Sequence, residues 1–329
     1  MKIVRLILLI LHVGIFLLLS GMLMNAYIPP KIFPWLNLLS LGFPFLITGY
    51  LLLTIFWIIS WKKRAFVFLF AGLLFFNATV RWVNFSSEKK EAADLKIVTF
   101  NTKGGILEGR EKIQQYLKSQ NADIIFLQED RGSGFEFNKY NKSNAKAILT
   151  IFTKHKISGD KLIDSQYVDV NAYGTQTDLE IKGKLYRLIN VYLHPFKFDK
   201  NMVKLDGSKE EKEQKLKNII KRLIPTFKEH QEQINVLRKA IENSPYPVIL
   251  AGDFNSVPNS YEYYHLGEGL QDAFIKVGNG SATSFHDYKF PIRIDYIFTS
   301  KSIQPITYKV DRSVKISDHY PVVATFKLR

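Results

Sequence analysis

Three long apolar runs occupy the first 85 residues of the chain. They extend over Val4–Tyr27, over Trp35–Ser60, and from Ala65 to Val80 with a possible extension to Phe85. A helix of about 20 apolar residues spans the hydrocarbon core of a bilayer. The pattern therefore predicts a membrane anchor over residues 1–85 that consists of three transmembrane helices.

The basic residues of this segment indicate its orientation. Residues 1–85 hold seven of the 45 Lys and Arg residues of the chain and none of its 30 Asp and Glu residues. Lys2 and Arg5 flank the first run, and Lys62–Arg64 separate the second run from the third. Because basic residues stay on the cytoplasmic side, both groups agree only with an inside N-terminus followed by three spans. We expect a multi-pass protein of the inner (plasma) membrane with its C-terminal domain on the outer, periplasmic or extracytoplasmic face.

Two other interpretations of the apolar runs are weaker. A cleaved signal peptide with Lys2 and Arg5 as its n-region would not need two further runs, and no small-x-small cleavage site lies near Ser20. A channel or transporter would place a carboxylate or a lysine at the centre of a run, and none is found there.

The pattern changes after the third run. Residues 86–94 are short, polar and charged, which predicts a linker. From residue 95 onward, short apolar segments alternate with polar ones, and Glu108–Ser119 has the spacing of an amphipathic helix. A long charged helix is predicted over Ser208–Asn243, with a break at Pro225. The predicted strands are Leu95–Phe100, Ala122–Gln128, Ala147–Phe152, Tyr167–Ala172, Asp178–Ile181, Tyr186–Leu193, Val248–Ala251, Arg293–Thr299, Thr307–Val310 and Tyr320–Lys327.

Two series of strands with helices outside them predict a layered α/β (α+β) sandwich over residues 95–329. An apolar content of 47% is ample for its core. The chain has no cysteine, which excludes disulfides, thiolate zinc sites and a cysteine nucleophile. Metal chemistry is thereby restricted to oxygen and imidazole ligands.

Polar side chains gather where the predicted strands end. Taken singly, each has a local explanation: Asn101 could cap a turn, Asp253 could start one, and Asp295 could pair with Arg293. Together, carboxylates and carboxamides held on rigid elements are what a hard cation such as Mg²⁺ requires. The residues concerned are Asn101, Glu129, Asp253, Asn255, Asp295, Asp318 and His319.

The sequences of these segments and their order along the chain resemble the endonuclease/exonuclease/phosphatase superfamily. This superfamily includes pancreatic deoxyribonuclease, abasic-site endonucleases, neutral sphingomyelinases and inositol-polyphosphate phosphatases. The resemblance covers essentially residues 95–329 and implies a four-layer sandwich of two packed, mostly antiparallel sheets flanked by helices. The matching segments are KIVTFNT (96–102), ADIIFLQED (122–130), LINVYLHP (188–195), VILAGDFNSVPNS (248–260), RIDYIF (293–298) and SDHYPV (317–322).

The resemblance also implies a role for each position. Glu129 would be the main ligand of Mg²⁺ (or Mn²⁺), with Asn101 and Asp318 completing the set. Asp253 would orient or deprotonate the attacking water, and Asn255 would hold a phosphate oxygen or support Asp253. His319 and Asp295 would form a pair in which the carboxylate fixes the imidazole and stabilises its charge.

One segment departs from the family's pattern. Many members carry Asn-x-His where this chain has Asn190-Val191-Tyr192, and a histidine follows at position 194. Strand alternation puts Asn190, Tyr192 and His194 on one face. Either Tyr192 or His194 therefore contacts the phosphate, with the register favouring Tyr192.

These inferences lead to a membrane-tethered, Mg²⁺-dependent phosphodiesterase. A nucleic acid substrate is favoured by the charge of +8 on residues 86–329, and a lipid head group by the tether. A phospholipid or sphingomyelin phosphodiesterase and a phosphomonoesterase remain alternatives. A degenerate binding module would have lost some of Glu129, Asp253, Asp295 and His319, and all four are present. No protein partner is indicated.

Overall fold

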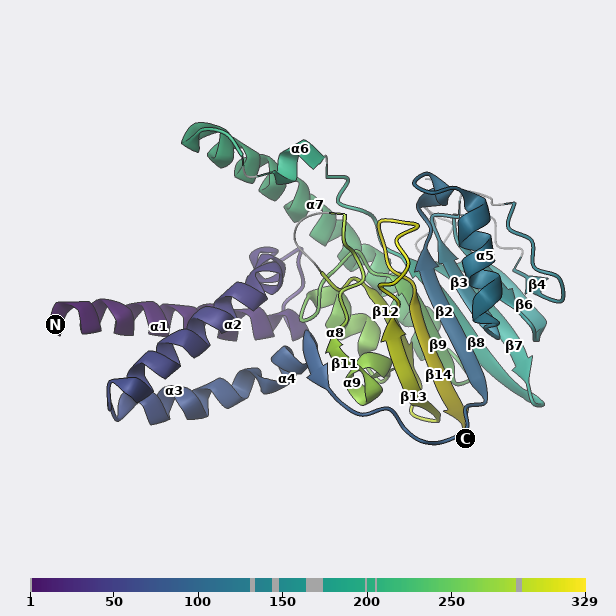
Figure 1. The fold of residues 1–329 in the computed structure, drawn as a ribbon, viewed down its shortest axis with the longest axis horizontal. Coiled ribbons are helices and arrows are strands. Elements are labelled where there is room, and N and C mark those ends of the chain that lie inside the picture. Colours follow the sequence, from purple (N-terminus) through teal and green to yellow (C-terminus); the bar gives the residue numbers. More distant parts are fainter. Residues whose placement is uncertain are drawn as a thin grey trace.

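The computed structural model describes residues 2–130, 134–143, 148–163, 174–198, 200–204, 206–287 and 292–329. Its N-terminal helices project from one side of a body built on two β-sheets (Figure 1). These helices are α1 (Lys2–Leu23), α2 (Trp35–Ile59), α3 (Arg64–Gly72) and α4 (Phe76–Val80), with short 3₁₀ turns at Met24–Ala26 and Leu73–Phe75.

Among the described residues, two helical segments are long and apolar enough to cross a membrane. They are Lys2–Ala26 and Trp35–Ile59, of 25 residues each with mean hydropathies of 2.7 and 2.0. Large apolar side chains on both face outward, Leu17 and Leu52 among them. A core helix of a soluble domain would bury such side chains.

Two of the three predicted transmembrane helices therefore reach the length of a full span, and the third does not. The third apolar run forms a shorter helical stretch, Arg64–Val80. The chain leaves the helix after Val80, and Val83–Phe85 becomes strand β1, paired antiparallel with β11 (Asn279–Ser281). The hydropathy of Val83 and Phe85 favours a place in the membrane anchor. In the structure, the backbone of this segment instead pairs with a strand of the C-terminal domain.

In the part of the C-terminal region that the structure describes, there are two six-stranded sheets. Strands β2 and β3 pair in parallel, as do β8 and β9, and the other neighbours are antiparallel. The first sheet has the order β10 (Gln271–Asp272), β12 (Asp295–Thr299), β9 (Val248–Asp253), β8 (Lys184–Tyr192), β7 (Gly174–Ile181), β6 (Lys156–Ile163). The second has the order β13 (Ile303–Val310), β14 (Val322–Leu328), β2 (Leu95–Asn101), β3 (Ile124–Gln128), β5 (Thr150–Thr153), β4 (Asn141–Lys142).

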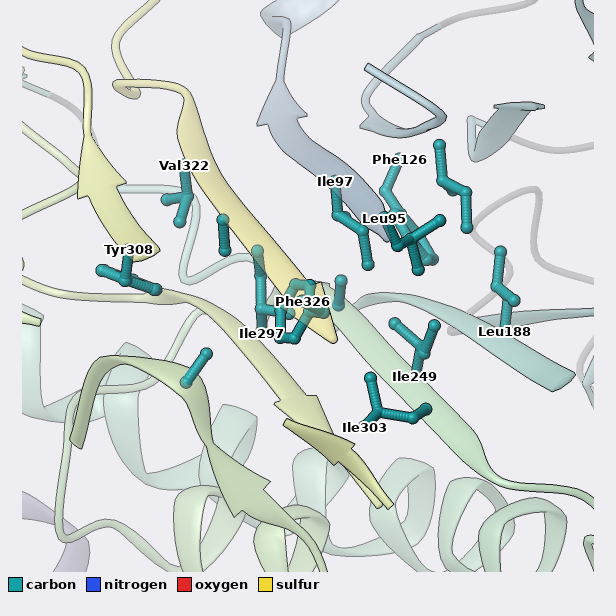
Figure 2. Close-up of a cluster of buried hydrophobic side chains, with 14 of the residues drawn as sticks. Leu95, Ile97, Phe126, Leu188, Ile249, Ile297, Ile303, Tyr308, Val322 and Phe326 are labelled. Carbon is teal, nitrogen blue, oxygen red and sulfur yellow. The ribbon is translucent and has the colours of Figure 1, made fainter. Parts of the chain in front are cut away.

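The sheets pack face to face around one apolar core (Figure 2). Ile97 and Phe126 reach this core from the second sheet, and Leu188 and Ile249 reach it from the first. Helix α5 (Arg110–Gln120) covers the outer face of the second sheet, and α7 (Lys209–Glu242) with α8 (Tyr261–Gly267) covers the outer face of the first. Two sheets flanked by helices confirm the predicted mixed α/β sandwich.

Helix α7 differs from its prediction at Pro225. Ser208 and Glu211 cap the helix reciprocally, and the helix then runs without interruption through Pro225 to Glu242. The neighbouring Phe227 is buried. The break predicted at Pro225 is wrong, because tertiary packing maintains a helix that the proline alone would destabilise. The predicted strand Tyr167–Ala172 lies outside the described residues.

Strand register brings the polar strand ends together. Asn101 of β2 lies beside Gln128 of β3, the residue before Glu129. In the other sheet, Asp253 of β9 is the register partner of both Tyr192 of β8 and Asp295 of β12. The packing of the two sheets gathers these residues at one edge of the sandwich.

Gly252 makes the close approach of β8 and β9 possible. Its φ is 140°, and a Cβ at this position would lie 2.1 Å from the carbonyl oxygen of Val191. The backbones of β8 and β9 are paired here, so neither can move away from the contact without displacing Asp253, the residue after Gly252. Only glycine fits here.

We expect Gly252→Ala to lower the free energy of unfolding by about 3 kcal/mol or more, since it combines backbone strain with a steric clash. Gly183→Ala is the matched control, because Gly183 also has a positive φ (77°) but open space around its Cβ position. That variant should lose only about 1–2 kcal/mol. Urea unfolding of the full chain in detergent micelles, followed by far-ultraviolet circular dichroism, measures both values. Equal losses would contradict the steric explanation.

Candidate active site

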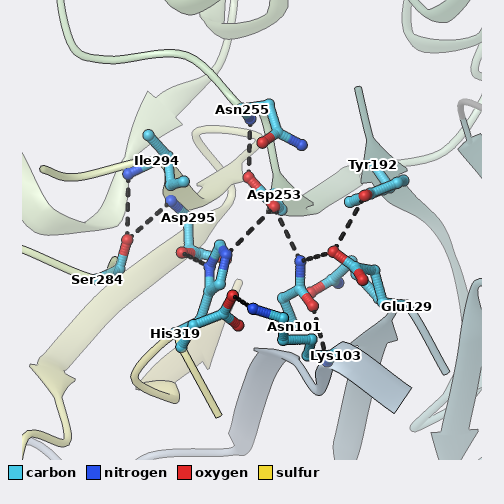
Figure 3. Close-up of polar contacts among 12 residues, drawn as sticks. Asn101, Lys103, Glu129, Tyr192, Asp253, Asn255, Ser284, Ile294, Asp295 and His319 are labelled. Carbon is cyan, nitrogen blue, oxygen red and sulfur yellow. Dashed lines mark hydrogen bonds and ion pairs between the residues drawn. The ribbon is translucent and has the colours of Figure 1, made fainter. Parts of the chain in front are cut away.

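His319 and Asp295 form a buried pair at the centre of the polar cluster. His319 Nδ1 lies 2.8 Å from Asp295 Oδ2. The backbone N–H of Asp295 donates to Ser284 Oγ at 3.0 Å, which fixes the start of β12. With Nδ1 engaged, the other ring nitrogen, Nε2, points toward Asp253 Oδ2 at 3.7 Å (Figure 3). The pair predicted from the sequence is thus assembled, and its imidazole faces a second carboxylate.

Asp253 has a hydrogen-bond donor on each carboxylate oxygen. Oδ1 accepts from the backbone N–H of Asn255 at 2.7 Å, and Oδ2 accepts from Asn101 Nδ2 at 3.0 Å. Asn255 has a left-handed backbone with a φ of 45°, which turns the chain sharply after β9. Its side-chain Nδ2 donates to the carbonyl oxygen of Leu193 at 2.8 Å. Asn255 therefore supports Asp253 through its backbone and the turn after β8 through its side chain.

Burial and mutual charge govern protonation in this group. Burial raises the pKa of Asp253 to about 7; the cationic His319 lowers it, and the neighbouring Asp295 raises it further. For His319, burial lowers the pKa, but the charges of Asp295 and Asp253 outweigh burial and raise the pKa to about 10. An imidazolium next to a carboxylate that can take up a proton near neutral pH is an arrangement suited to acid–base chemistry.

Asn101 and Glu129 extend the cluster into the second sheet. Asn101 Nδ2 also donates to Glu129 Oε1 at 3.0 Å, so one amide bridges the carboxylates of Glu129 and Asp253 (Figure 3). Glu129 has a positive φ of 50°, a conformation rarely adopted by residues other than glycine. Backbone strain of this kind concentrates at functional sites, where the surrounding structure imposes it.

Tyr192 and His194 diverge in the structure. Tyr192 ends β8, and its hydroxyl donates to Glu129 Oε1 at 3.0 Å. His194 lies beyond the strand; its backbone N–H donates to Gln233 on α7, and its Nε2 lies 3.9 Å from Glu229 Oε2, also on α7. Burial and the Glu129 charge raise the pKa of Tyr192, which keeps its hydroxyl protonated as a donor. The geometry thus places Tyr192 in the cluster and directs His194 toward α7.

Asp318 occupies the outer side of the cluster. Ser317 Oγ donates to the carbonyl oxygen of Asn101 at 2.9 Å and to Asp318 Oδ1 at 3.1 Å, which ties the last loop to β2. Burial raises the pKa of Asp318, but the charge of His319 and the ammonium of Lys103 outweigh burial and lower the pKa. Asp318 is therefore an anion at neutral pH.

Lys103 is a site residue that the sequence analysis missed. Its Nζ pairs with Asp318 Oδ2 and lies 3.8 Å from Asp287 Oδ2, while its backbone N–H donates to Asn101 Oδ1 at 3.0 Å. Its position two residues after Asn101 was a usable signal, since a residue so close to a strand-end ligand lies in the same cluster. Lys103 therefore supplies a positive charge beside Asp318, and its side chain is 31% exposed.

The residues present fit a hard divalent cation. Glu129, Asn101 and Asp318 provide only oxygen donors, which is the ligand chemistry of Mg²⁺ and Mn²⁺. A second group, Asp253, Asp295 and His319, has its candidate ligand atoms within 4.8 Å of one another. In this group the 2.8 Å bond between His319 and Asp295 engages Nδ1, so we favour the oxygen set.

Comparison with known proteins supports this interpretation. Residues 211–319 match the model of the Endonuclease/Exonuclease/phosphatase family, and residues 5–82 match a domain of unknown function (DUF8431). The matching family model is that of the superfamily that the sequence resembles, and it covers residues 211–319 of the chain. No curated protein matches the chain.

Two solved structures are similar to this chain. A crystal structure of D. rerio TDP2, humanized by 14 mutations, is 17% identical with a TM-score of 0.51, covering 71% of this chain and 98% of its own. An AP endonuclease from Archaeoglobus fulgidus is 21% identical with a TM-score of 0.49, covering 71% of this chain and 100% of its own. At this identity, the TDP2 likeness establishes the fold alone.

The separation of Tyr192 from His194 can be tested directly. We expect Tyr192→Phe to lower the kcat of phosphoester hydrolysis by about 10²-fold, because it removes a donor from the cluster. His194→Ala should change kcat by less than about threefold, since its side chain lies against α7. Steady-state kinetics of the two variants measure the difference. A larger loss for His194→Ala would reverse the assignment.

Proposed function

Because residues 211–319 match the model of the Endonuclease/Exonuclease/phosphatase family, we propose that the chain carries a catalytic domain of this family and is a membrane-tethered, Mg²⁺-dependent phosphodiesterase. The observation that carries the proposal is the buried arrangement of His319, Asp295 and Asp253, with Asn101 joining Asp253 to Glu129. Phosphodiester hydrolysis needs an oriented water, a cation on the developing charge and neutralisation of the phosphate. Each need has a residue in this cluster.

Asp253 is the group that orients and deprotonates water. Its two oxygens are fixed by Asn255 and Asn101, so its free lone pairs point in a defined direction. A carboxylate whose pKa is about 7 accepts a proton readily at neutral pH. The proton then resides on Asp253, whose burial favours the neutral, protonated form.

His319 stabilises the charge that develops on the phosphate. Asp295 holds the ring by Nδ1, so the hydrogen on Nε2 is available to a phosphate oxygen. Tyr192, which contacts Glu129, and Lys103, which contacts Asp318, provide a neutral and a charged donor in the same cluster. Glu129, with Asn101 and Asp318, would hold Mg²⁺, which supplies further neutralisation of the phosphate when it is bound.

Nucleic acid is the substrate we favour. Residues 86–329 carry a net charge of +8, and neutralisation of phosphates dominates the affinity of proteins for nucleic acid. A phospholipid head group is the second candidate, favoured by the two apolar helices that adjoin the domain. Activity of the purified full chain on DNA, RNA, sphingomyelin and inositol phosphates separates these classes.

We further propose that the catalytic domain lies on the outer face of the inner membrane, with the N-terminus inside. The N-terminus and the turn between α2 and α3 lie at the end of the helices that points away from the sheets (Figure 1). Lys2, Arg5 and Lys62–Arg64 are therefore at that same end. In this proposal the shorter apolar stretch Arg64–Val80 would make a third crossing and return the chain to the domain.

Removal of divalent cations should abolish activity. Treatment with EDTA should reduce hydrolysis to background, and Mg²⁺ or Mn²⁺ should restore it, because the ligand set has no soft donors. Glu129→Gln should raise the Mg²⁺ concentration needed for half-maximal activity. Full turnover in EDTA would show that the metal assignment is wrong.

His319→Ala should lower kcat by about 10³-fold or more with little change in KM, since a contact made in the transition state is lost. Asp295→Asn should be less damaging, because the imidazole stays but loses its orienting charge. His265→Ala, on α8, is the folding control. A well-folded His319→Ala protein with near-native kcat would remove His319 from the mechanism.

The orientation is tested by a reporter enzyme fused after Arg329. An alkaline phosphatase, which is active only outside the cytoplasm, should be active at this position. A reporter that works only in the cytoplasm should be silent there. The opposite pattern would place the catalytic domain inside.

A further inference from the structure

A second buried polar cluster lies where the N-terminal helices meet the catalytic domain. Asn37, in the first turn of α2, donates from Nδ2 to both carboxylate oxygens of Glu262, at 3.0 and 2.8 Å. Its Oδ1 accepts from the backbone N–H of Tyr261 at 2.8 Å. Glu262 on α8 is fully buried, with an exposed fraction of 0%. A buried carboxylate needs such donors, since losing one leaves an uncompensated charge.

His230 continues this cluster toward the active site. Its Nδ1 lies 2.8 Å from Glu262 Oε1, and its Nε2 lies 2.8 Å from the carbonyl oxygen of His194. A carbonyl only accepts, so Nε2 carries a hydrogen and donates. The preceding carbonyl, of Leu193, is the one that accepts from Asn255. A continuous chain of contacts thus connects α2 with the loop that holds Asp253.

Asn259 makes a second connection, at the end of the loop that follows β9. It is fully buried and has a left-handed backbone with a φ of 69°. Its carbonyl oxygen accepts from Asn25 Nδ2 at 3.1 Å and from Ser40 Oγ at 2.9 Å. Its side chain donates to the carbonyl oxygen of Ala78 at 3.1 Å and accepts from Arg81 at 2.9 Å. Residues next to α1, on α2, on α4 and after α4 therefore converge on one loop of the active site.

We propose that the N-terminal helical region, residues 2–82, is a positioning part of the active site and not a detachable anchor. From this region Asn37 acts through Glu262 on α8 and His230 on α7. These three are positioning residues: they touch no reacting atom, but through His230 they hold the turn after β8, which in turn holds Asn255. The inference rests on the proposed phosphodiesterase function. Its physical basis is that catalytic groups misplaced by about 1 Å lose about 10²-fold in rate.

A double-mutant cycle on the full chain in detergent micelles tests the proposal. Asn37→Asp keeps the acceptor for Tyr261 but sets a second carboxylate against Glu262. Glu262→Gln keeps the volume but sets an amide N–H₂ against that of Asn37. In the double variant, the amide introduced at position 262 donates to the carboxylate introduced at position 37 and can still accept from His230. The hydrogen bond between positions 37 and 262 is thereby restored, with position 262 as the donor and position 37 as the acceptor.

We expect each single substitution to lower kcat by about tenfold or more with little change in KM, and the double variant to recover most of that loss. Hydrogen–deuterium exchange of residues 192–198 and 254–262 should rise in the single variants and return toward wild type in the double variant. Asn243→Asp, at the exposed C-terminal end of α7, is the matched control and should leave kcat unchanged.

Folded single variants with wild-type kcat and exchange would overturn the proposal, as would a double variant no more active than its parents. If Asn37→Asp does not fold, Glu262→Gln and the double variant still decide the question. Failure of the proposed function is distinguishable: the wild-type chain would then hydrolyse no phosphodiester, whereas the exchange measurements would still report whether Asn37 holds the two loops.

Discussion

The site depends on keeping two carboxylates and one imidazole together out of water. Asp253 and Asp295 are each 1% exposed and His319 is 4% exposed. Adjacent strands impose this proximity, since Asp253 and Asp295 are register partners on β9 and β12. Two anions buried side by side would cost several kcal/mol each without a cation. The imidazolium of His319 compensates them, which makes it both the structural counter-ion and the chemical donor of the site.

Much of this site could be predicted from residues at strand ends. Asn101, Glu129 and Asp253 each follow an apolar segment, and a sandwich brings the ends of its central strands to one edge. The position of a residue at a strand end could not decide between Tyr192 and His194. Strand alternation puts both side chains on one face, but only if the strand extends as far as His194. The strand ends at Tyr192, and the next residues turn toward α7. Where a strand ends is set by its neighbours, which hydropathy does not describe.

The N-terminal region shows a different limit of sequence reasoning. Asn25, Asn37 and Ser40 lie within or beside apolar runs and have no charge, so hydropathy treats them as tolerated polar residues of a span. The structure turns them toward Asn259 and Glu262. The structural role of these side chains depends on hydrogen-bond partners more than 200 residues away in the chain. For the same reason, hydropathy includes Val83–Phe85 in the membrane anchor, although this segment pairs as a strand with Asn279–Ser281.

The central claim is that this cluster hydrolyses a phosphoester by directing water at phosphorus. Hydrolysis of a simple phosphodiester by the purified full chain, with Mg²⁺ and in water labelled with heavy oxygen, tests it most directly. We predict that the label appears in the phosphate product and not in the released alcohol, because Asp253 and His319 act on water and phosphate. Label in the alcohol, or no hydrolysis of any phosphodiester, would contradict the account.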